Sequence, residues 1–180
     1  MANVLGLAGS LRKASFNAGL LRAAAEECPD GLAITIGTIA GVPLYDADDE
    51  AANGLPDAVQ TLQAQLADAD ALLLVTPEYN NGVPGVFKNA IDWMSRGDGL
   101  KHFKGKPVAV IGASPGGFGT NLAQAHWLPV LRTLGTRPWF EGRMMVSRAG
   151  QVFDDDGNLT DDKTRDALRT FLAGFQASLG

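Results

Sequence analysis

Two spacings of apolar residues alternate along this chain: short apolar runs are followed by segments in which apolar residues recur every three or four positions. The runs predict strands and the segments predict amphipathic helices. The clearest run, residues 71–76, is continuously apolar, as is typical of a strand covered on both faces. We expect five strands, at residues 3–8, 32–36, 71–76 and 108–111 and within 138–146.

Helices are expected between these strands. Ser15 is placed to cap a helix at residues 16–27, and Pro56 with Asp57 opens the next one. Further helices are expected at 84–94 and 121–134, and Thr160 is expected to cap the last one. Strands that alternate with helices predict an α/β fold, with a parallel sheet covered by helices on both faces. We find no internal repeat or linker, so residues 1–180 are expected to form a single domain.

Composition excludes several classes of partner. A net charge of −5 argues against a nucleic-acid partner, which would need a basic face. No apolar run approaches the roughly 20 residues of a membrane span. Cys28 is the only cysteine, which excludes an internal disulfide and a cysteine-ligated iron–sulfur cluster. The sequence starts directly with a strand pattern and shows no signal peptide, so we expect a cytoplasmic protein.

The turn after the first strand combines hydroxyls, an amide and two cations, in the sequence Gly9-Ser10-Leu11-Arg12-Lys13-Ala14-Ser15-Phe16-Asn17. It leads into a helix start, where N–H groups and the helix dipole favour an anion. The spacing fits neither a Walker loop nor a dinucleotide fingerprint. Because its donors are mostly side chains, we expect a terminal phosphate monoester as the ligand. The alternative is that Ser15 only caps the helix and that Arg12 and Lys13 are solvated.

Two more loops follow strands and should meet this turn at one edge of the sheet. One is Pro77-Glu78-Tyr79-Asn80-Asn81-Gly82-Val83-Pro84-Gly85, a stiff loop with amides and an aromatic ring. The other is Ala113-Ser114-Pro115-Gly116-Gly117-Phe118-Gly119-Thr120, whose glycines allow close approach to a ligand. Taken alone, the first loop is as well explained by a rigid turn, and the glycines of the second are better explained by an ordinary tight turn. Together with the phosphate turn they indicate a mononucleotide-sized cofactor, and FMN fits well.

These motifs resemble the NADPH-dependent FMN reductase family, in particular its chromate and quinone reductases. The resemblance is carried by Gly9-Ser10-Leu11-Arg12 with Ser15 and Asn17, Pro43-Leu44-Tyr45-Asp46, Pro77-Glu78-Tyr79-Asn80, Pro84-Gly85, Lys88-Asn89-Ala90-Ile91-Asp92-Trp93 and Phe153-Asp154-Asp155-Asp156-Gly157. It implies a flavodoxin-like three-layer sandwich with strand order 2-1-3-4-5. It also implies non-covalent FMN near a subunit boundary, in a homodimer or homotetramer.

The resemblance also implies which residues bind the cofactor. The phosphate would be held by Ser10, Leu11, Arg12, Ser15, Phe16 and Asn17. The isoalloxazine would be lined by Pro77, Glu78, Tyr79, Asn80 and Asn81, and the site closed by Ser114, Gly116 and Gly117. Relatives often carry another glycine and an arginine after Gly119, where this chain has Thr120-Asn121, so no contact is carried over there.

The expected function is an FMN-dependent NAD(P)H oxidoreductase. It would transfer hydride in a two-electron, ping-pong reaction to quinones or to azo compounds, chromate or free flavin. The flavin performs the chemistry, so no catalytic side chain is assigned. The alternatives are a one-electron carrier like flavodoxin, which Arg12 disfavours, and a non-catalytic flavin-binding redox sensor. The choice between NADPH and NADH stays open.

Other conspicuous residues have simpler explanations. His126 and Trp127 are expected to pack or to contact a subunit, and His102 to be solvated; neither histidine has a partner at metal-ligand spacing. The segment 88–93 is expected to serve packing and interface. The acidic residues 154–158 do not fit a calcium loop, because Val152 and Lys163 would occupy ligand positions, and are expected to form a solvated turn.

Overall fold

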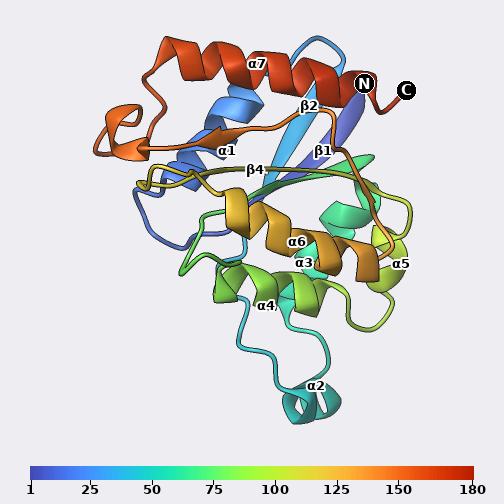
Figure 1. Ribbon diagram of the computed structural model, residues 1–180. Helices are drawn as coiled ribbons and strands as arrows, with labels where there is room; N and C mark the ends of the chain where they lie inside the picture. Colours follow the sequence, from blue (N-terminus) through green and yellow to red (C-terminus); the bar gives the residue numbers. More distant parts are fainter.

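A six-stranded parallel sheet lies between two layers of helices in the computed structural model, which describes residues 1–180 (Figure 1). Its strands are β1 (Ala2–Ala8), β2 (Leu32–Gly37), β3 (Ala71–Val75), β4 (Pro107–Ala113), β5 (Arg137–Pro138) and β6 (Met145–Val146). They follow the order β2-β1-β3-β4-β5, and β6 also pairs with β4. Every pairing is parallel, so the expected flavodoxin-like α/β topology is confirmed.

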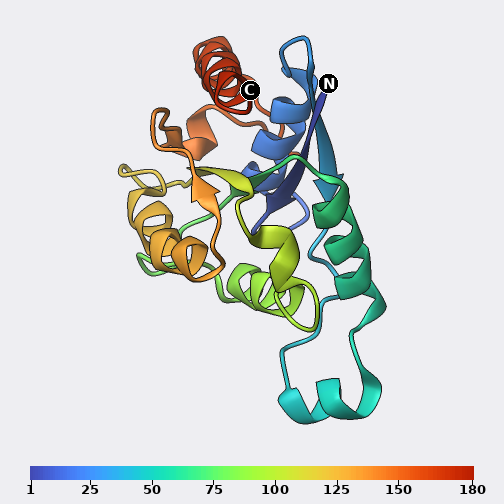
Figure 2. The ribbon, with the colours of Figure 1, turned by 90° about the vertical axis from the view of Figure 1, so that its right-hand side faces the viewer.

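The helices cover the two faces of the sheet in separate groups, as Figure 2 shows. They are α1 (Phe16–Glu26), α2 (Ala47–Asn53), α3 (Asp57–Asp68), α4 (Gly85–Met94), α5 (Leu100–Phe103), α6 (Asn121–Thr133) and α7 (Asp162–Ala177). One core is formed with α1 and α7, and the other with α3, α4 and α6. None of the helices combines the length and the apolar character that crossing a membrane requires.

The central strand β3 contributes to both cores. All five of its residues are buried. Leu73 and Val75 belong to the core beneath α1 and α7, whereas Leu72 and Leu74 belong to the opposite one. Successive side chains of a strand point to opposite faces, so a continuous apolar run is what a strand between two helical layers requires.

The fifth strand differs from the single strand expected within 138–146. Trp139 N–H still bonds to Val108 O at 2.8 Å, and the ladder resumes where Gly112 N–H bonds to Met144 O. Between these points the chain leaves β4, because the Trp139 ring packs edge-on against Phe171 of α7. The edge is therefore two strands of two residues each.

Two short helices and one cap also differ from expectation. The residues before Gly54 form α2, capped by Asp46, which accepts from Asp48 N–H at 2.8 Å. Since α2 buries none of its residues, it lacks the apolar spacing that would have predicted it. The four residues of α5 are too few to show such spacing. The cap of α7 is Asp161, not Thr160, because the Asp161 carboxylate accepts from Thr164 N–H.

Candidate functional site

A hollow of about 270 Å³ opens beyond the carboxyl ends of β1, β3 and β4. These strands are neighbours in the sheet, so the three loops that follow them meet there. The hollow is lined by Ser10, Arg12, Ser15, Phe16, Asn17, Pro77, Glu78, Tyr79, Ala113, Ser114 and Pro115. Most of the expected cofactor residues are thus brought together. Leu11, Asn80, Asn81, Gly116 and Gly117 are not among the lining residues, whereas Ala113 and Pro115 had not been singled out.

The start of α1 offers an open anion site. Ser15 caps the helix as expected, and its Oγ accepts from Ala18 N–H at 3.3 Å. The N–H groups of Phe16 and Asn17 donate no hydrogen bond. The first turn of α1 carries no acidic residue, so nothing within it offsets the positive end of the helix dipole.

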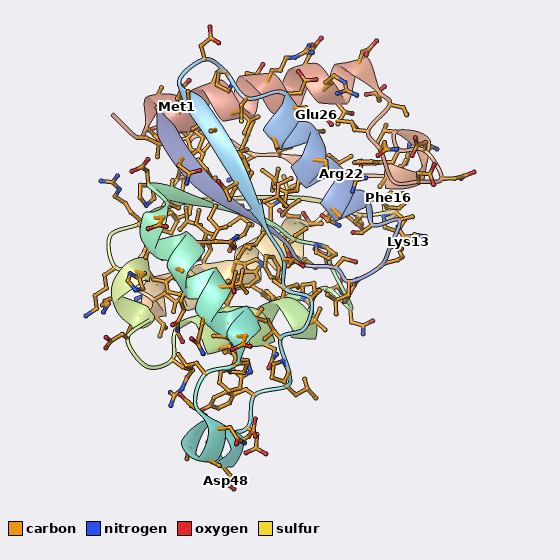
Figure 3. All side chains as sticks on the ribbon, turned by 180° about the vertical axis from the view of Figure 1, so that it is seen from behind. Met1, Lys13, Phe16, Arg22, Glu26 and Asp48 are labelled. Carbon is orange, nitrogen blue, oxygen red and sulfur yellow. The ribbon has the colours of Figure 1, made fainter.

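The side chains before this helix add further donors. Ser10 Oγ accepts from Arg12 N–H at 3.3 Å, and Ser15 Oγ also acts as an acceptor, so both hydroxyl hydrogens stay free to donate. The exposed Arg12 guanidinium lies 4.8 Å from the centre of the Phe16 ring and makes no salt bridge. Figure 3 shows Lys13 and Phe16 on this rim of the molecule.

Asn17 has a different role from the other residues of this turn. Its Nδ2 donates to Ala113 O and its Oδ1 accepts from Ala113 N–H, both at 2.8 Å. The side chain is buried, and these two bonds tie the first turn of α1 to the end of β4. Asn17 therefore supports the floor of the hollow, with one amide hydrogen left for a ligand.

The acidic turn, residues 154–158, packs against α1 from outside the hollow. A Cβ on Gly19 would lie 1.6 Å from Gly157 O. Arg22 Nη2 donates to Asn158 Oδ1 at 2.9 Å, and the Phe16 and Phe153 rings lie 5.3 Å apart. The turn was expected to be solvated; it is also docked on the helix that carries the anion site.

The loop after β3 forms a tight turn at the opposite wall. Tyr79 and Gly82 exchange two backbone hydrogen bonds, and Asn80 and Asn81 have φ angles of 48° and 62°. Two central residues with positive φ define a type I′ turn, in which asparagine is favoured. Asn80 and Asn81 thus shape the turn, which presents the half-exposed Tyr79 ring beside the hollow.

Glu78 reaches from this loop to α6. Its Oε2 accepts from the N–H groups of Leu122 and Ala123 at 2.8 and 2.9 Å. The carboxylate therefore caps α6 from a distant part of the chain and offsets the positive end of that helix. Unlike α1, α6 does not offer an open anion site.

The glycine-rich loop after β4 is held from outside by the residues that follow β6. Ala149 N–H bonds to Ser114 O, and Arg148 N–H bonds to Gly116 O, each at 3.0 Å. Thr120 stands where similar proteins often carry a further glycine. It is fully buried, and its Oγ1 accepts from Gln124 Nε2 at 3.0 Å. Its side chain is thus part of the packing and not of a ligand contact.

The segment 88–93 serves packing, as expected. Asn89 Nδ2 and Trp93 Nε1 both donate to Pro43 O, and Asn89 Oδ1 accepts from Tyr45 N–H. These bonds hold the base of the projecting segment that contains α2, on which Asp48 lies far from the sheet (Figure 3).

The remaining conspicuous residues lie outside the hollow. Trp127 is fully buried with its ring edge-on to Phe87, whereas His126 is exposed on α6 and His102 is half-buried. The Cys28 thiol donates to Ala24 O, and burial raises its pKa, which disfavours the reactive thiolate.

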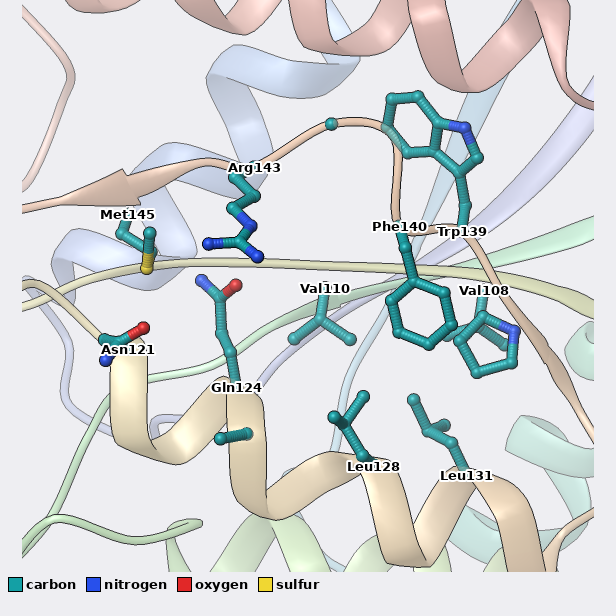
Figure 4. Close-up of a pocket in the computed structure, with 13 residues that line it drawn as sticks. Val108, Val110, Asn121, Gln124, Leu128, Leu131, Trp139, Phe140, Arg143 and Met145 are labelled. Carbon is teal, nitrogen blue, oxygen red and sulfur yellow. The ribbon is translucent and has the colours of Figure 1, made fainter.

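A second hollow of about 200 Å³ lies between α6 and the segment joining β5 to β6. Figure 4 shows Arg143 and Gln124 pointing toward one another at one end, with Phe140, Leu128 and Leu131 at the other. This hollow contains neither a hydroxyl cluster nor an open helix start, so of the two hollows the one at the strand ends has the chemistry suited to a phosphate.

Comparisons with known proteins agree with this geometry. Residues 2–151 match the family model described as NADPH-dependent FMN reductase. The chain is 44% identical to an NAD(P)H-dependent FMN reductase of Pseudomonas aeruginosa, over 96% of this chain and 92% of the relative. It is 40% identical to a 2-hydroxy-1,4-benzoquinone reductase of a Burkholderia species, over 94% and 91%. Among solved structures, the flavoenzyme NAD(P)H:(acceptor) oxidoreductase FerB from Paracoccus denitrificans superposes with a TM-score of 0.87 at 36% identity, covering 99% of this chain and 97% of that one.

Proposed function

Because the chain belongs to the NADPH-dependent FMN reductase family, we propose that it is an FMN-dependent NAD(P)H oxidoreductase that reduces quinones and similar acceptors. The observation that carries the proposal is the open anion site at the start of α1, placed opposite the turn after β3 across one hollow. FMN would require a site for its phosphate, such as the start of α1, and room for its flat ring between the loops that line the hollow.

The donors at the start of α1 fit a phosphate monoester. Two free hydroxyl hydrogens, from Ser10 and Ser15, meet two free N–H groups, from Phe16 and Asn17, and the unpaired Arg12 guanidinium lies beside them. We assign the phosphate to Ser10, Leu11, Arg12, Ser15, Phe16 and Asn17. The ring is assigned to Pro77, Glu78, Tyr79, Asn80 and Asn81 on one side and to Ser114, Gly116 and Gly117 on the other.

Bound FMN would supply the centre that takes up and passes on hydride. The ionisable side chains of the hollow are Arg12, Glu78 and Tyr79, and the Glu78 carboxylate is engaged at α6. We therefore assign no catalytic side chain; the residues bind, orient and enclose. The electron donor, NADPH or NADH, and the acceptor would use the open side of the hollow in turn, which predicts ping-pong kinetics.

The proposal is tested first by the absorption spectrum of the purified protein, with and without NADPH. A flavin spectrum that NADPH bleaches, together with steady quinone-dependent NADPH oxidation, distinguishes an enzyme from a carrier and from a sensor. A protein that stays colourless after incubation with FMN would refute the proposal.

Arg12→Ala tests the phosphate assignment, with Lys13→Ala as the matched control. A hydrogen bond to a charged group contributes about 1.5–3 kcal/mol, so Arg12→Ala should raise the FMN Kd about 10- to 100-fold. Lys13 is a neighbouring exposed cation that does not line the hollow, so Lys13→Ala should change the Kd by less than about threefold. Turnover at saturating FMN should change little in either variant. Equal Kd values in both variants would contradict the assignment.

We also propose a homodimer or homotetramer. Large apolar side chains are exposed on and around α6: Phe118 is 89% exposed, Phe140 66%, and Leu122 and Leu128 42% each. Large exposed apolar patches are typical of protein interfaces. Light scattering coupled to gel filtration tests the assembly, and a monomeric mass would exclude it.

A cytoplasmic location stays a proposal, supported by the family's nicotinamide donor.

A further inference from the structure

Glu78 connects the loop after β3, which lines the hollow, to the start of α6, which lies beyond it and is far away in sequence. It follows Pro77 at the end of β3, and its Oε2 accepts from Leu122 and Ala123, 44 and 45 residues later. The residue at the usual cap position, Thr120, makes no side-chain cap, because its hydroxyl is directed to Gln124. The start of α6 therefore depends on a carboxylate supplied by the loop after β3.

We propose that Glu78 is a positioning residue that fastens the start of α6 to the turn after β3 and thereby sets the separation of the two walls around the flavin. The same turn approaches α6 at a second place, since a Cβ added to Gly82 would lie 3.6 Å from Nδ1 of His126. The glycine-rich loop 114–120 runs directly into α6, so fastening α6 also fixes the far wall.

Glu78 could instead act through its charge alone, and the two roles predict opposite effects. A negative charge in the hollow disfavours a dianionic phosphate, so losing only the charge should leave FMN binding unchanged or stronger. Losing the link lets the walls separate, which should weaken binding. Charge and reach can be changed independently at this position, because glutamine keeps the length and aspartate keeps the charge.

The inference rests on the proposed FMN site for its functional consequence, but the link itself can be measured without flavin. Amide hydrogen exchange at the start of α6, in FMN-free protein, should be slow in the parent and in Glu78→Gln, whose amide oxygen can still accept. Exchange should be faster in Glu78→Asp and Glu78→Ala, which lack the reach. Unchanged exchange in Glu78→Ala would overturn the inference whether or not the protein binds FMN.

FMN affinity, measured by quenching of flavin fluorescence, gives the functional test. Glu78→Asp and Glu78→Ala should raise the Kd about tenfold, the equivalent of one helix cap lost from the bound state. Glu78→Gln should bind at least as tightly as the parent. Asp161→Ala is the matched control: it removes the cap of α7, and neither Asp161 nor α7 lines the hollow. It should lower the Tm as Glu78→Ala does, without changing the Kd.

Two results would overturn the proposal. If Glu78→Asp binds FMN like the parent, the charge matters and the reach does not. If Glu78→Gln weakens binding as much as Glu78→Ala, the carboxylate contacts the cofactor and does not act through α6. A parent protein that fails to bind FMN would refute the proposed function. The contact between Glu78 and the start of α6 would then still be tested by the hydrogen-exchange experiment.

Discussion

Gly19→Ala tests how closely the acidic turn supports the helix that carries the anion site. On helix propensity alone, alanine within a helix should be more stable than glycine by about 1 kcal/mol. The structure predicts the opposite result, because the added Cβ would lie 1.6 Å from Gly157 O. Real Cβ atoms essentially never approach another atom within 3.0 Å, so the turn must move by at least 1.4 Å, the difference between these distances.

The movement has a defined energetic consequence. Arg22 would lose its bonds to Gly157 O and Asn158 Oδ1, which are now 3.3 and 2.9 Å long. Because the clash is with a backbone oxygen, its cost should lie near the upper end of the range of about 1–3 kcal/mol for overpacking, so a net loss of about 2 kcal/mol remains after the gain in helix propensity. For a domain of this size each kcal/mol shifts the Tm by about 2–4 °C. We therefore expect Gly19→Ala to unfold about 4–8 °C below the parent.

Gly85→Ala provides the control for this measurement. Gly85 also lies in a helix, and a Cβ there would meet nothing within 4 Å. Thermal unfolding followed by circular dichroism should place Gly85→Ala at or above the parent Tm and Gly19→Ala below it. A Gly19→Ala variant as stable as the parent would show that the acidic turn is not held against α1.

Two further predictions concern stability. Asn17→Ala removes both bonds to Ala113 and leaves a buried N–H and a buried C=O unpaired. The free energy of unfolding, measured by urea titration, should therefore fall by about 2–5 kcal/mol. A loss below about 1 kcal/mol would contradict the support role assigned to Asn17. Hydrogen bonds from Arg165 and Arg169 lower the pKa of Glu27 in the folded protein. The ionised Glu27 therefore stabilises the fold at pH values above its unfolded pKa of about 4.3, and this stabilisation is lost as the pH falls through the folded pKa. The Tm of Glu27→Gln should therefore lie below the parent's at pH 7 and approach it as the pH falls below about 4; an equal difference at pH 3 and pH 7 would show that the carboxylate charge plays no part.

The sheet and its main helices could be predicted from sequence because their signals are local. A run such as 71–76 needs only its own residues to indicate a strand between two layers, and Ser15 marks a helix start within a few positions. Elements that depend on distant contacts could not be predicted. The projecting segment is held by Asn89 and Trp93, and the edge strand is split because Trp139 turns toward α7. These contacts join residues that are far apart in sequence, so no local pattern of residues predicts them.

The same distinction applies within the hollow. The three loops could be placed together because each follows a strand, yet the task of each side chain depends on which strand ends are neighbours. Asn17 and Glu78 are polar residues in ligand-type loops, so sequence assigns both of them to the cofactor. Since β4 lies beside β3, which lies beside β1, Asn17 reaches the backbone of Ala113, and Glu78 reaches the start of the helix that follows β4. Their hydrogen-bonding groups are thus largely used within the protein. The polar side chains whose donors are all free, those of Ser10, Ser15 and Arg12, have no partner across the sheet, and for this reason they are the side chains on which phosphate binding should depend.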